Sequence, residues 1–248
     1  MTSPDGFSFA EDAFAAPVFS ADADAAPAAV CRGVGKTYRT ATESVPALVD
    51  VSLAIPRARV TVVVGPSGSG KSSLLRLLAC IDSPDTGEVL IAGQRVDRLR
   101  PRARRRLRQR QVAYLFQRPG ENLLPYLDAV AQIRLAASLR GAPVTEAAAL
   151  DLLERLGLRE RADHVPGQLS GGEQQRLAVA CGVVGDPALV VADEPTAELD
   201  TAAAERVLTA MEDLAAAGVG FVLSSHDPRV MAIADGFVRL DHGRLVEA

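Results

Sequence analysis

The sequence has no tryptophan and only three cysteines in 248 residues. Cys31, Cys80 and Cys181 are odd in number, lie far apart and form no CxxC pair. Disulfide frameworks and zinc sites need paired or closely spaced cysteines, so we interpret these three as reduced, buried thiols. The scarcity of cysteine therefore argues against a disulfide-stapled or zinc-stapled domain.

Long apolar runs and early basic residues are also missing. No stretch approaches the roughly 18 apolar residues that a membrane-spanning helix needs. No basic residue precedes Arg32, so the N-terminus does not resemble a secretory signal. We expect a cytoplasmic protein that meets a membrane only through a partner. The net charge of −4 gives the chain as a whole no attraction for nucleic acid.

Residues 1–28 differ in composition from the rest of the chain. They are rich in alanine and proline and hold five acidic residues, no basic ones and four of the seven phenylalanines. Such a composition predicts a disordered tail. Two interpretations of this acidic tail stay open: a leader without a role, and an acidic-aromatic docking segment.

From about residue 29 the pattern is that of a folded domain. Helical patterns at 71–81, 144–158 and 202–217 alternate with apolar strands, Gly157 is a plausible stop for the second helix, and the last twelve residues suggest a hairpin. Buried strands alternating with helices predict a mainly parallel sheet covered on both faces. The predicted strands are "RVTVVVGP" (59–66), "GEVLIAG" (87–93), "ALVVADEP" (188–195) and "GVGFVLSSHD" (218–227).

The stretch "GPSGSGKS", residues 65–72, fits the pattern G-x-x-x-x-G-K-[ST] between a predicted strand and a predicted helix. Its glycines let the backbone wrap around phosphates with the N–H groups pointing inward. Lys71 supplies a compact charge, and it is one of only two lysines among 27 basic side chains. The Ser72 hydroxyl suits Mg²⁺.

Two further strand ends carry chemistry. Asp193 and Glu194 end one apolar strand, at the edge where α/β sheets bind ligands. Asp193 suits a metal ion, and strand alternation would point Glu194 the other way, toward an attacking water. His226 ends another strand and suits a phosphate-sensing role, whereas we expect His164 and His242 to be surface residues.

The stretch "LSGGEQQR", residues 169–176, predicts a second anion site. Ser170 and Glu173 form a capping box, which marks the start of a helix, and two glycines between them leave the first-turn amides unshielded. The sequence thus contains two phosphate-type sites about a hundred residues apart, which one small domain does not obviously need.

The ordered set "GPSGSGKS", Gln117 in "YLFQ", "LSGGEQQR", "LVVADEP", "AELD" and "SSHD" resembles the ATP-binding subunits of ABC transporters, from residue 29 to the end. The resemblance implies a P-loop NTPase core with an N-terminal antiparallel β portion and an inserted helical subdomain at about 118–184. It implies ATP and Mg²⁺, with Gln117 joining Ser72 and Asp193 at the metal. The residues expected at the nucleotide are Tyr38 at the adenine, Gly65, Pro66, Ser67, Gly68, Ser69, Gly70, Lys71, Ser72 and Ser73.

The resemblance also accounts for the two anion sites, because this family sandwiches ATP between two cassettes. Ser170, Gly171, Gly172 and Gln174 would then contact the ATP held by a second cassette, so a homodimer is expected, and a heterodimer with a related cassette stays open. Glu194 would polarise water, His226 would hold the γ-phosphate, Asp200 would communicate across the dimer and Gln117 would report to a membrane permease subunit. The protein would lie peripherally on the cytoplasmic face of the membrane.

A finer similarity, in "CIDSPDTGEVLIAGQRV" and "NLLPYL", is to the lipoprotein-release and macrolide-exporter group. The chain departs from that group after Gln117, where "RPGENLLP" is about two residues longer than expected and Ala131-Gln132 replace the usual "EN". Two other functions stay open: a mechanical or signalling module that transports nothing, and a soluble ABC ATPase acting on nucleic acid or ribosomes.

Eight arginines and no acidic residue lie in "RLRPRARRRLRQR", residues 98–110. This arginine run has three interpretations: a solvated basic helix, a face toward anionic lipid headgroups, and a nucleic-acid contact. The last is disfavoured because single-strand binding calls for interleaved aromatic side chains, which the run lacks.

Overall fold

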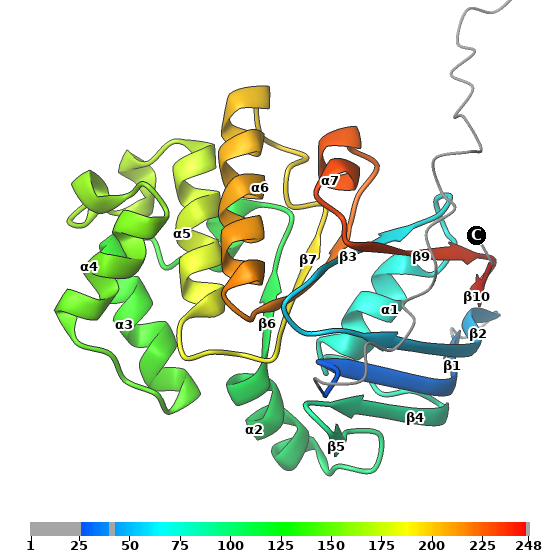
Figure 1. Cartoon of the computed structure of the whole chain (residues 1–248). Coiled ribbons are helices and arrows are strands. Elements are labelled where there is room, and N and C mark those ends of the chain that lie inside the picture. Colours follow the sequence, from blue (N-terminus) through cyan, green and yellow to red (C-terminus); the bar gives the residue numbers. More distant parts are fainter. Residues whose placement is uncertain (1–25, 40–42, 247–248) are drawn as a thin grey trace, which may run out of the picture.

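The computed structural model describes residues 26–39 and 43–246. The acidic tail, apart from its last three residues, lies outside this range. Two sheets organise the chain (Figure 1). The first is antiparallel, has the strand order β2-β1-β4-β5 and confirms the expected antiparallel portion. Its strands are β1 Ala29–Arg39, β2 Ser44–Ile55, β4 Thr86–Ile91 and β5 Gln94–Arg95.

The second sheet has six strands in the order β10-β9-β3-β8-β7-β6. All neighbouring pairs are parallel except β9 and β10, which form the predicted C-terminal hairpin. The mainly parallel sheet expected from the sequence is therefore confirmed. Its strands are β3 Val60–Val64, β6 Val112–Leu115, β7 Leu189–Asp193, β8 Gly220–Ser224, β9 Gly236–Asp241 and β10 Arg244–Leu245.

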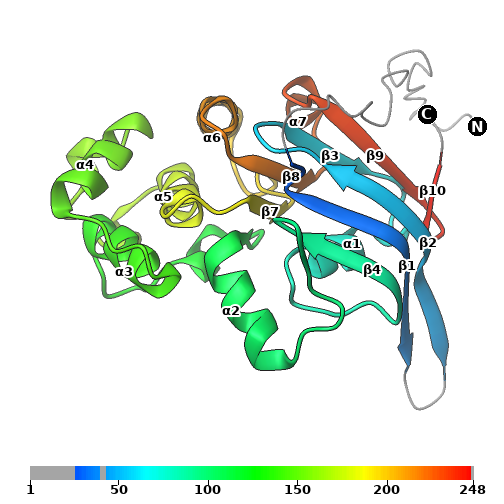
Figure 2. The ribbon, with the colours of Figure 1, turned by 60° about the horizontal axis from the view of Figure 1, so that its bottom comes forward.

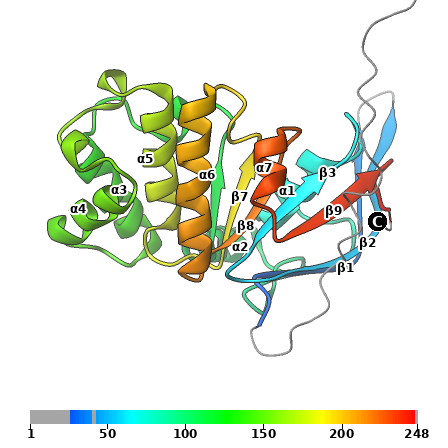
Figure 3. The same cartoon turned by 45° about the horizontal axis from the view of Figure 1, so that its top comes forward.

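Helices cover both faces of this six-stranded sheet (Figure 3). The period of two along each strand divides its apolar side chains between two cores, because successive side chains point to opposite faces. On β7, Leu189 and Val191 join one core while Val190 and Ala192 join the other. The sheet is thus buried on both sides, as continuous apolar strands require.

The helix α1 (Lys71–Leu78) lies between the two sheets, and its leucines share one core with β1, β2 and β4. The opposite core holds α3 (Ala129–Arg140), α4 (Glu146–Arg155), α5 (Gly171–Val183) and α6 (Thr201–Ala216). Figure 1 shows α3, α4 and α5 grouped on the side away from the antiparallel sheet. The grouping fits the expected helical insertion, whose boundaries stay a prediction.

Short elements complete the chain. The helix α2 (Pro101–Gln111) carries most of the arginine run and precedes β6, and α7 (Pro228–Ala232) follows β8. The 3₁₀ turn η2 (Pro119–Asn122) lies between β6 and α3, and η3 (Arg159–Arg161) and η4 (Pro166–Gln168) lie between α4 and α5. In the part of the chain that the structure describes, no helix is both long and apolar enough to cross a membrane.

Candidate nucleotide site

The phosphate loop joins β3 to α1 and is built around glycines that cannot be replaced without displacing backbone. Gly65 and Gly70 have φ of 149° and 102°. A Cβ at Gly65 would lie 2.1 Å from the Leu240 carbonyl oxygen, and one at Gly70 would lie 2.4 Å from the Ala47 carbonyl oxygen. Ala47 lies in β2 and Leu240 lies in β9, so these two strands pack against the outside of the loop.

The interior of the phosphate loop offers polar groups without partners. Gly70 caps α1 with no side-chain hydrogen bond, and the first turn of α1 carries no acidic residue. The hydroxyl of Ser69 is buried and has no hydrogen-bond partner in the part of the chain that the structure describes. Lys71 Nζ donates to the carbonyl oxygens of Gly65 at 2.7 Å and Pro66 at 3.0 Å, so its charge lies directly over the loop. Uncapped amides, an orphan hydroxyl and one cation suit a phosphate.

Asp193 and Glu194 lie at the carboxyl end of β7. The Ser224 hydroxyl donates to Asp193 Oδ1, which leaves Oδ2 without a hydrogen-bond partner among the described residues. Ser72 stands exposed in the first turn of α1. The available donors at this edge are oxygens, the type that hard cations such as Mg²⁺ prefer.

Glu194 sits just beyond the end of β7, so strand alternation does not decide where it points. Its φ of 48° lies in the left-handed region, and its amide donates to the Ser224 carbonyl oxygen at 3.0 Å. The Ser225 hydroxyl donates to Glu194 Oε2 at 3.2 Å. His226 Nε2 lies 3.9 Å from Glu194 Oε1, so the structure brings the expected base and the expected phosphate sensor together.

The loop after β8 is held from its other side by Asp227. Its carboxylate accepts from Thr196 Oγ1 at 3.0 Å and from Arg229, and its amide donates to Ser225 Oγ at 3.1 Å. The Arg229 guanidinium holds the pKa of Asp227 below its ordinary value, so this carboxylate stays charged. Ser224, Ser225 and Asp227 were quoted in "SSHD" without a role, and only their place at a strand end could have singled them out.

Gln117 follows β6 on the same sheet edge. Strands β6 and β7 pair with Leu115 opposite Ala192, so Gln117 and Glu194 lie two residues beyond paired positions. The departures noted in the sequence have a structural use here. Gln132 is buried and clasps the loop after Gln117, accepting from the Leu124 amide and donating to the Leu124 and Leu127 carbonyl oxygens.

Tyr38 projects from β1 beside the end of α1. Its hydroxyl donates to Asp82 Oδ2 at 2.9 Å, and Asp82 in turn pairs with Arg76. Lys36 Nζ lies 5.4 Å from the Tyr38 ring centroid and donates to the Ser83 carbonyl oxygen. Lys36, for which the sequence offered no role, thus lies beside the ring, and Tyr38 as a residue remains 37% exposed.

The predicted capping box at Ser170 is confirmed. Ser170 Oγ accepts from the Glu173 amide at 3.3 Å, and Glu173 Oε2 accepts from the Ser170 amide at 2.8 Å. The hydrogen bond from the Ser170 amide, together with the Arg161 guanidinium, lowers the pKa of the Glu173 carboxyl. Gly172 packs on α6, where a Cβ would lie 2.6 Å from the Cβ of Ala203. Gly171 is exposed at the start of α5.

Gln174 and Asp200, which are expected to face a second cassette, form hydrogen bonds within their own chain. Gln174 Nε2 donates to the carbonyl oxygens of Pro166 and Leu169, and Asp200 caps α6 by accepting from the Ala203 amide at 2.8 Å. Among the described residues, no hydrogen bond or ion pair joins the phosphate loop to the Ser170 region. Helices α1 and α5 pack on opposite faces of the sheet, so the two predicted anion sites stay separate within one chain.

Among the described residues, neither of the two remaining histidines pairs with Glu194 or His226. His164 is half-buried in the turn after η3, where its carbonyl oxygen accepts from the Ala129 amide, and His242 is exposed in the β9–β10 turn. The expectation that both are surface residues holds for His242, whereas packing against α3 half-covers His164.

Comparisons with known proteins agree with this geometry. Residues 48–197 match the family described as ABC transporter. The chain is 39% identical over 220 residues to the lipoprotein-releasing system ATP-binding protein LolD of Chromohalobacter salexigens, covering 88% of this chain and 92% of that one. It is 41% identical over 223 residues to the macrolide export ATP-binding/permease protein MacB 1/2 of Paracoccus denitrificans, but spans only 33% of that protein.

Solved structures of ATP-binding cassettes also match the fold of this chain. The dimeric ATP-binding cassette MJ0796, in a post-hydrolysis state with ADP and Pi, superposes with a TM-score of 0.77 at 31% identity, over 88% of this chain and 96% of that one. A second dimeric structure of the same cassette superposes with a TM-score of 0.76.

Proposed function

The chain belongs to the ABC transporter family and carries its ATPase cassette, and from this premise we propose that two copies close around ATP to energise a membrane transporter of the lipoprotein-release or macrolide-export type. One observation carries the proposal. Asp193, Glu194 and His226 converge at one edge of the sheet that also holds the phosphate loop, and Glu194 lies within 3.9 Å of His226. The match to LolD over nearly its full length supports the subgroup.

In this proposal the phosphate loop and Lys71 hold the phosphates of ATP, and Tyr38 offers its free face to the adenine. Ser72, Asp193 and Gln117 would hold Mg²⁺, which neutralises charge on the phosphate oxygens when bound. Glu194, oriented by the Ser225 hydroxyl, polarises the attacking water, and His226 contacts the γ-phosphate. Catalysis is then positioning and charge stabilisation.

The second anion site is proposed to serve the other cassette. Ser170, Gly171, Gly172 and Gln174 would contact the ATP held by the partner, and Asp200 would lie near the junction of the two copies. Separation of the two sites within one chain supports this arrangement, because each site then needs a complement from outside. The dimeric solved relatives are consistent with it.

The proposed partner in the membrane is a permease subunit, which would bring the protein to the cytoplasmic face. A groove of about 550 Å³ lies between β6, α3 and α5 and reaches the segment just before Gln117. Its rim exposes Phe116 (44%) and Leu139 (61%), and large apolar side chains exposed together suit a protein contact. A segment docked in this groove would sense the Gln117 loop directly.

The substitution Glu194→Gln tests the catalytic part. It keeps the shape of the side chain and its bond to Ser225 but removes the base. We expect ATP turnover to fall by about 10²–10⁴-fold while ATP binding is kept, and the variant to elute as an ATP-bound dimer in gel filtration. Glu212→Gln, on an exposed carboxylate of α6, serves as the control and should retain turnover.

Unchanged turnover in Glu194→Gln would refute the assignment of the base.

Purification of the tagged protein in mild detergent, with copurified proteins identified by mass spectrometry, tests the partner. A multi-span membrane protein in near-equal amount supports the transporter. Ribosomal proteins or nuclease-sensitive nucleic acid in its place would leave only the ATPase.

A further inference from the structure

Helix α2 and strand β5 border a groove of about 460 Å³. Figure 2 shows α2 between α3 on one side and β4 on the other. Its apolar part is formed by Leu99 and Leu107. Four arginines line it: Arg100, Arg102, Arg106 and Arg110. This α2 groove therefore combines an apolar floor with a strongly basic rim.

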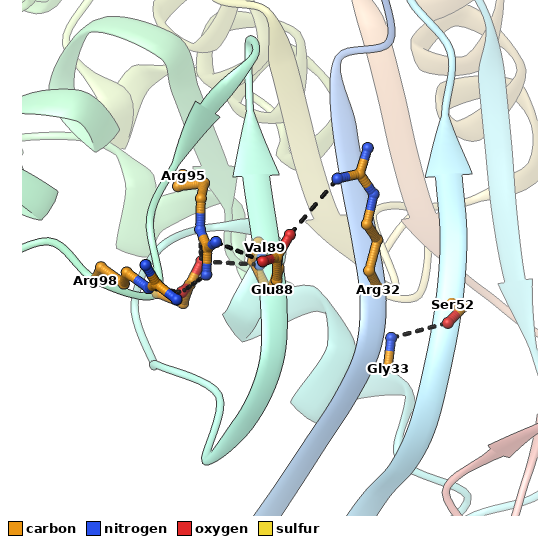
Figure 4. A network of polar contacts seen from close by, with 8 residues as sticks. Arg32, Gly33, Ser52, Glu88, Val89, Arg95 and Arg98 are labelled. Carbon is orange, nitrogen blue, oxygen red and sulfur yellow. Dashed lines mark hydrogen bonds and ion pairs between the residues drawn. The ribbon is translucent and has the colours of Figure 1, made fainter.

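The carboxylates nearest to this groove in sequence are already used by other arginines (Figure 4). Glu88 pairs with Arg32 and Arg95, and Asp97 pairs with Arg95 at 2.7 Å and Arg98 at 3.9 Å. None of the four groove arginines forms an ion pair with any Asp or Glu that the structure describes. The basic rim thus has no counter-charge within the described fold.

Helical geometry makes this lack of counter-charge costly. Arg102, Arg106 and Arg110 are spaced four residues apart on α2, so they lie on one face and repel one another. An acidic segment placed along this face would remove the repulsion and gain charge-assisted hydrogen bonds from the guanidinium groups. The ligand that fits the α2 groove is therefore a polyanion with some apolar surface.

The chain itself supplies such a segment next to the groove. The carbonyl oxygen of Ala28 accepts from the Ala92 amide at 2.9 Å, and Gln94, two residues further on, lines the groove. The 25 residues that precede the described part contain five carboxylates, no basic side chain and four phenylalanines. Fully extended, 25 residues reach about 80–90 Å, so the groove is within easy reach.

We propose that residues 1–25 dock in the α2 groove, with their carboxylates on the arginines and their phenylalanines on the apolar floor. A tethered segment acts at a high effective concentration, so individually weak surface ion pairs suffice to hold it. The docked segment covers the arginine run and keeps it from anionic lipids and nucleic acid. This inference goes beyond the proposed function and does not depend on ATP hydrolysis.

The absence of tryptophan gives a direct probe. In the full-length variant Phe14→Trp the new indole is the only one in the chain. We expect its emission in 50 mM NaCl to be blue-shifted and protected from iodide quenching. As NaCl rises to about 0.5 M the emission should shift toward that of a solvent-exposed indole, because salt screens surface charges. Solvent-like emission at every salt concentration would overturn the proposal.

Charge reversal then locates the docking site. In the Phe14→Trp background, Arg102→Glu/Arg106→Glu should expose the indole already in 50 mM NaCl. The matched control Arg134→Glu/Arg155→Glu makes the same charge change on exposed residues of α3 and α4 and should leave the indole protected. Equal loss of protection in both variants, or in neither, would show that the segment does not dock on α2.

Neutralising the segment gives the converse test. The full-length variant D5N/E11Q/D12N/D22N/D24N should expose the indole of Phe14→Trp at low salt. Without Phe14→Trp, the same neutralised chain should bind vesicles that contain phosphatidylglycerol more strongly than the wild type does, because the α2 arginines are uncovered. Binding of the wild type to these vesicles with no gain on neutralisation would instead assign the groove to lipid headgroups and refute the proposal.

Discussion

The phosphate loop and the Ser170 region are both glycine-containing helix starts, yet they are finished differently. Helix α1 has no side-chain cap and no acid in its first turn, so its amides and an orphan Ser69 hydroxyl are left for a ligand. Helix α5 is capped by Ser170 and carries Glu173 at its own start. The start of α1 therefore keeps its donors for a proposed anion, whereas the start of α5 uses part of its hydrogen-bonding capacity within the chain.

In the proposed function, this difference explains how one chain can carry two phosphate-type sites without redundancy. The uncapped start of α1 suits binding of most of the phosphate charge. The capped start of α5 suits a weaker contact from the opposite side of the nucleotide. This division of labour is what a site shared between two cassettes requires. Substitutions at the two helix starts should therefore have different signatures.

The largest effect is expected at the uncapped start. Lys71→Ala removes the one cation that, among the described residues, is bonded to the phosphate-loop carbonyls. We expect loss of ATP binding and a fall in ATPase of at least about 10²-fold, the usual cost of losing a preorganised charge contact. Fluorescent ATP-analogue binding and phosphate release measure the two effects. Normal ATP affinity in this variant would contradict the assignment of the loop.

At the capped start we expect a loss of ATP turnover without a loss of ATP binding. Ser170→Ala should lower the free energy of unfolding by about 1 kcal/mol, as N-cap removals do, and should abolish ATPase while nucleotide binding by the separate chain is kept. Thr145→Ala removes the equivalent cap of α4, where Thr145 Oγ1 accepts from the Ala148 amide at 3.2 Å. Thr145→Ala should show the stability loss alone. Equal ATPase activity in Ser170→Ala and Thr145→Ala would show that Ser170 does not contact the ATP of a second cassette.

Glycines sharpen the same comparison. Gly70→Ala forces a Cβ against the Ala47 carbonyl oxygen at a left-handed φ, whereas Gly68, at φ 78°, has nothing within 4 Å of its Cβ position. We expect both Gly70→Ala and Gly68→Ala to lose about 1–2 kcal/mol of unfolding free energy because of the left-handed conformation, and only Gly70→Ala to lose more. Denaturant unfolding and ATP affinity measure this difference. Equal losses would show that Ala47 does not restrict the loop.

Ser225→Ala tests the support of the base. Without its hydroxyl bond, Glu194 samples more orientations, so kcat should fall by about 5- to 10-fold, less than the 10²–10⁴ expected from loss of the base. KM for ATP should stay unchanged, and Ser225→Thr should restore most of kcat. A change in KM with constant kcat would instead place Ser225 at the nucleotide.

The smallest effect concerns pH. The pKa of Glu173 is lowered in the folded chain, so its contribution to stability is present above its unfolded value near 4.3 and is lost as pH falls below it. Glu173→Gln should lower the free energy of unfolding by about 0.5 kcal/mol at pH 7 and by less at pH 3, because the contribution is lost as pH falls through the lowered pKa of the folded chain. The exposed Glu160→Gln should have no effect at either pH. A constant penalty across this range would refute the charged cap.

Much of this could be predicted from local pattern alone. The phosphate loop, the strand ends at Asp193 and His226, the capping box and the terminal hairpin all depend on short spacings that physical chemistry interprets directly. The predicted helix at 71–81 overran, because α1 ends at Leu78 and Cys80 has a φ of 54°, which apolar periodicity does not reveal.

Contacts distant in sequence could not be predicted. The bonds of Ser224 to Asp193 and of Ser225 to Glu194 span about thirty residues, and the clasp by Gln132 looked only like a departure from a family pattern. The expected direction of Glu194 was argued from strand alternation, but the strand ends one residue earlier. Tertiary position, not local propensity, decides such details.

The most direct test of the central claim mixes two variants that are inactive alone. Lys71→Ala keeps an intact Ser170, and Ser170→Ala keeps an intact phosphate loop, so a mixed dimer holds one complete shared site. The account predicts that the ATPase of a 1:1 mixture rises clearly above that of either variant alone, while mixing Lys71→Ala with Thr145→Ala gives no such gain over Thr145→Ala. A Lys71→Ala and Ser170→Ala mixture that stays as inactive as its components would contradict a site shared between two cassettes.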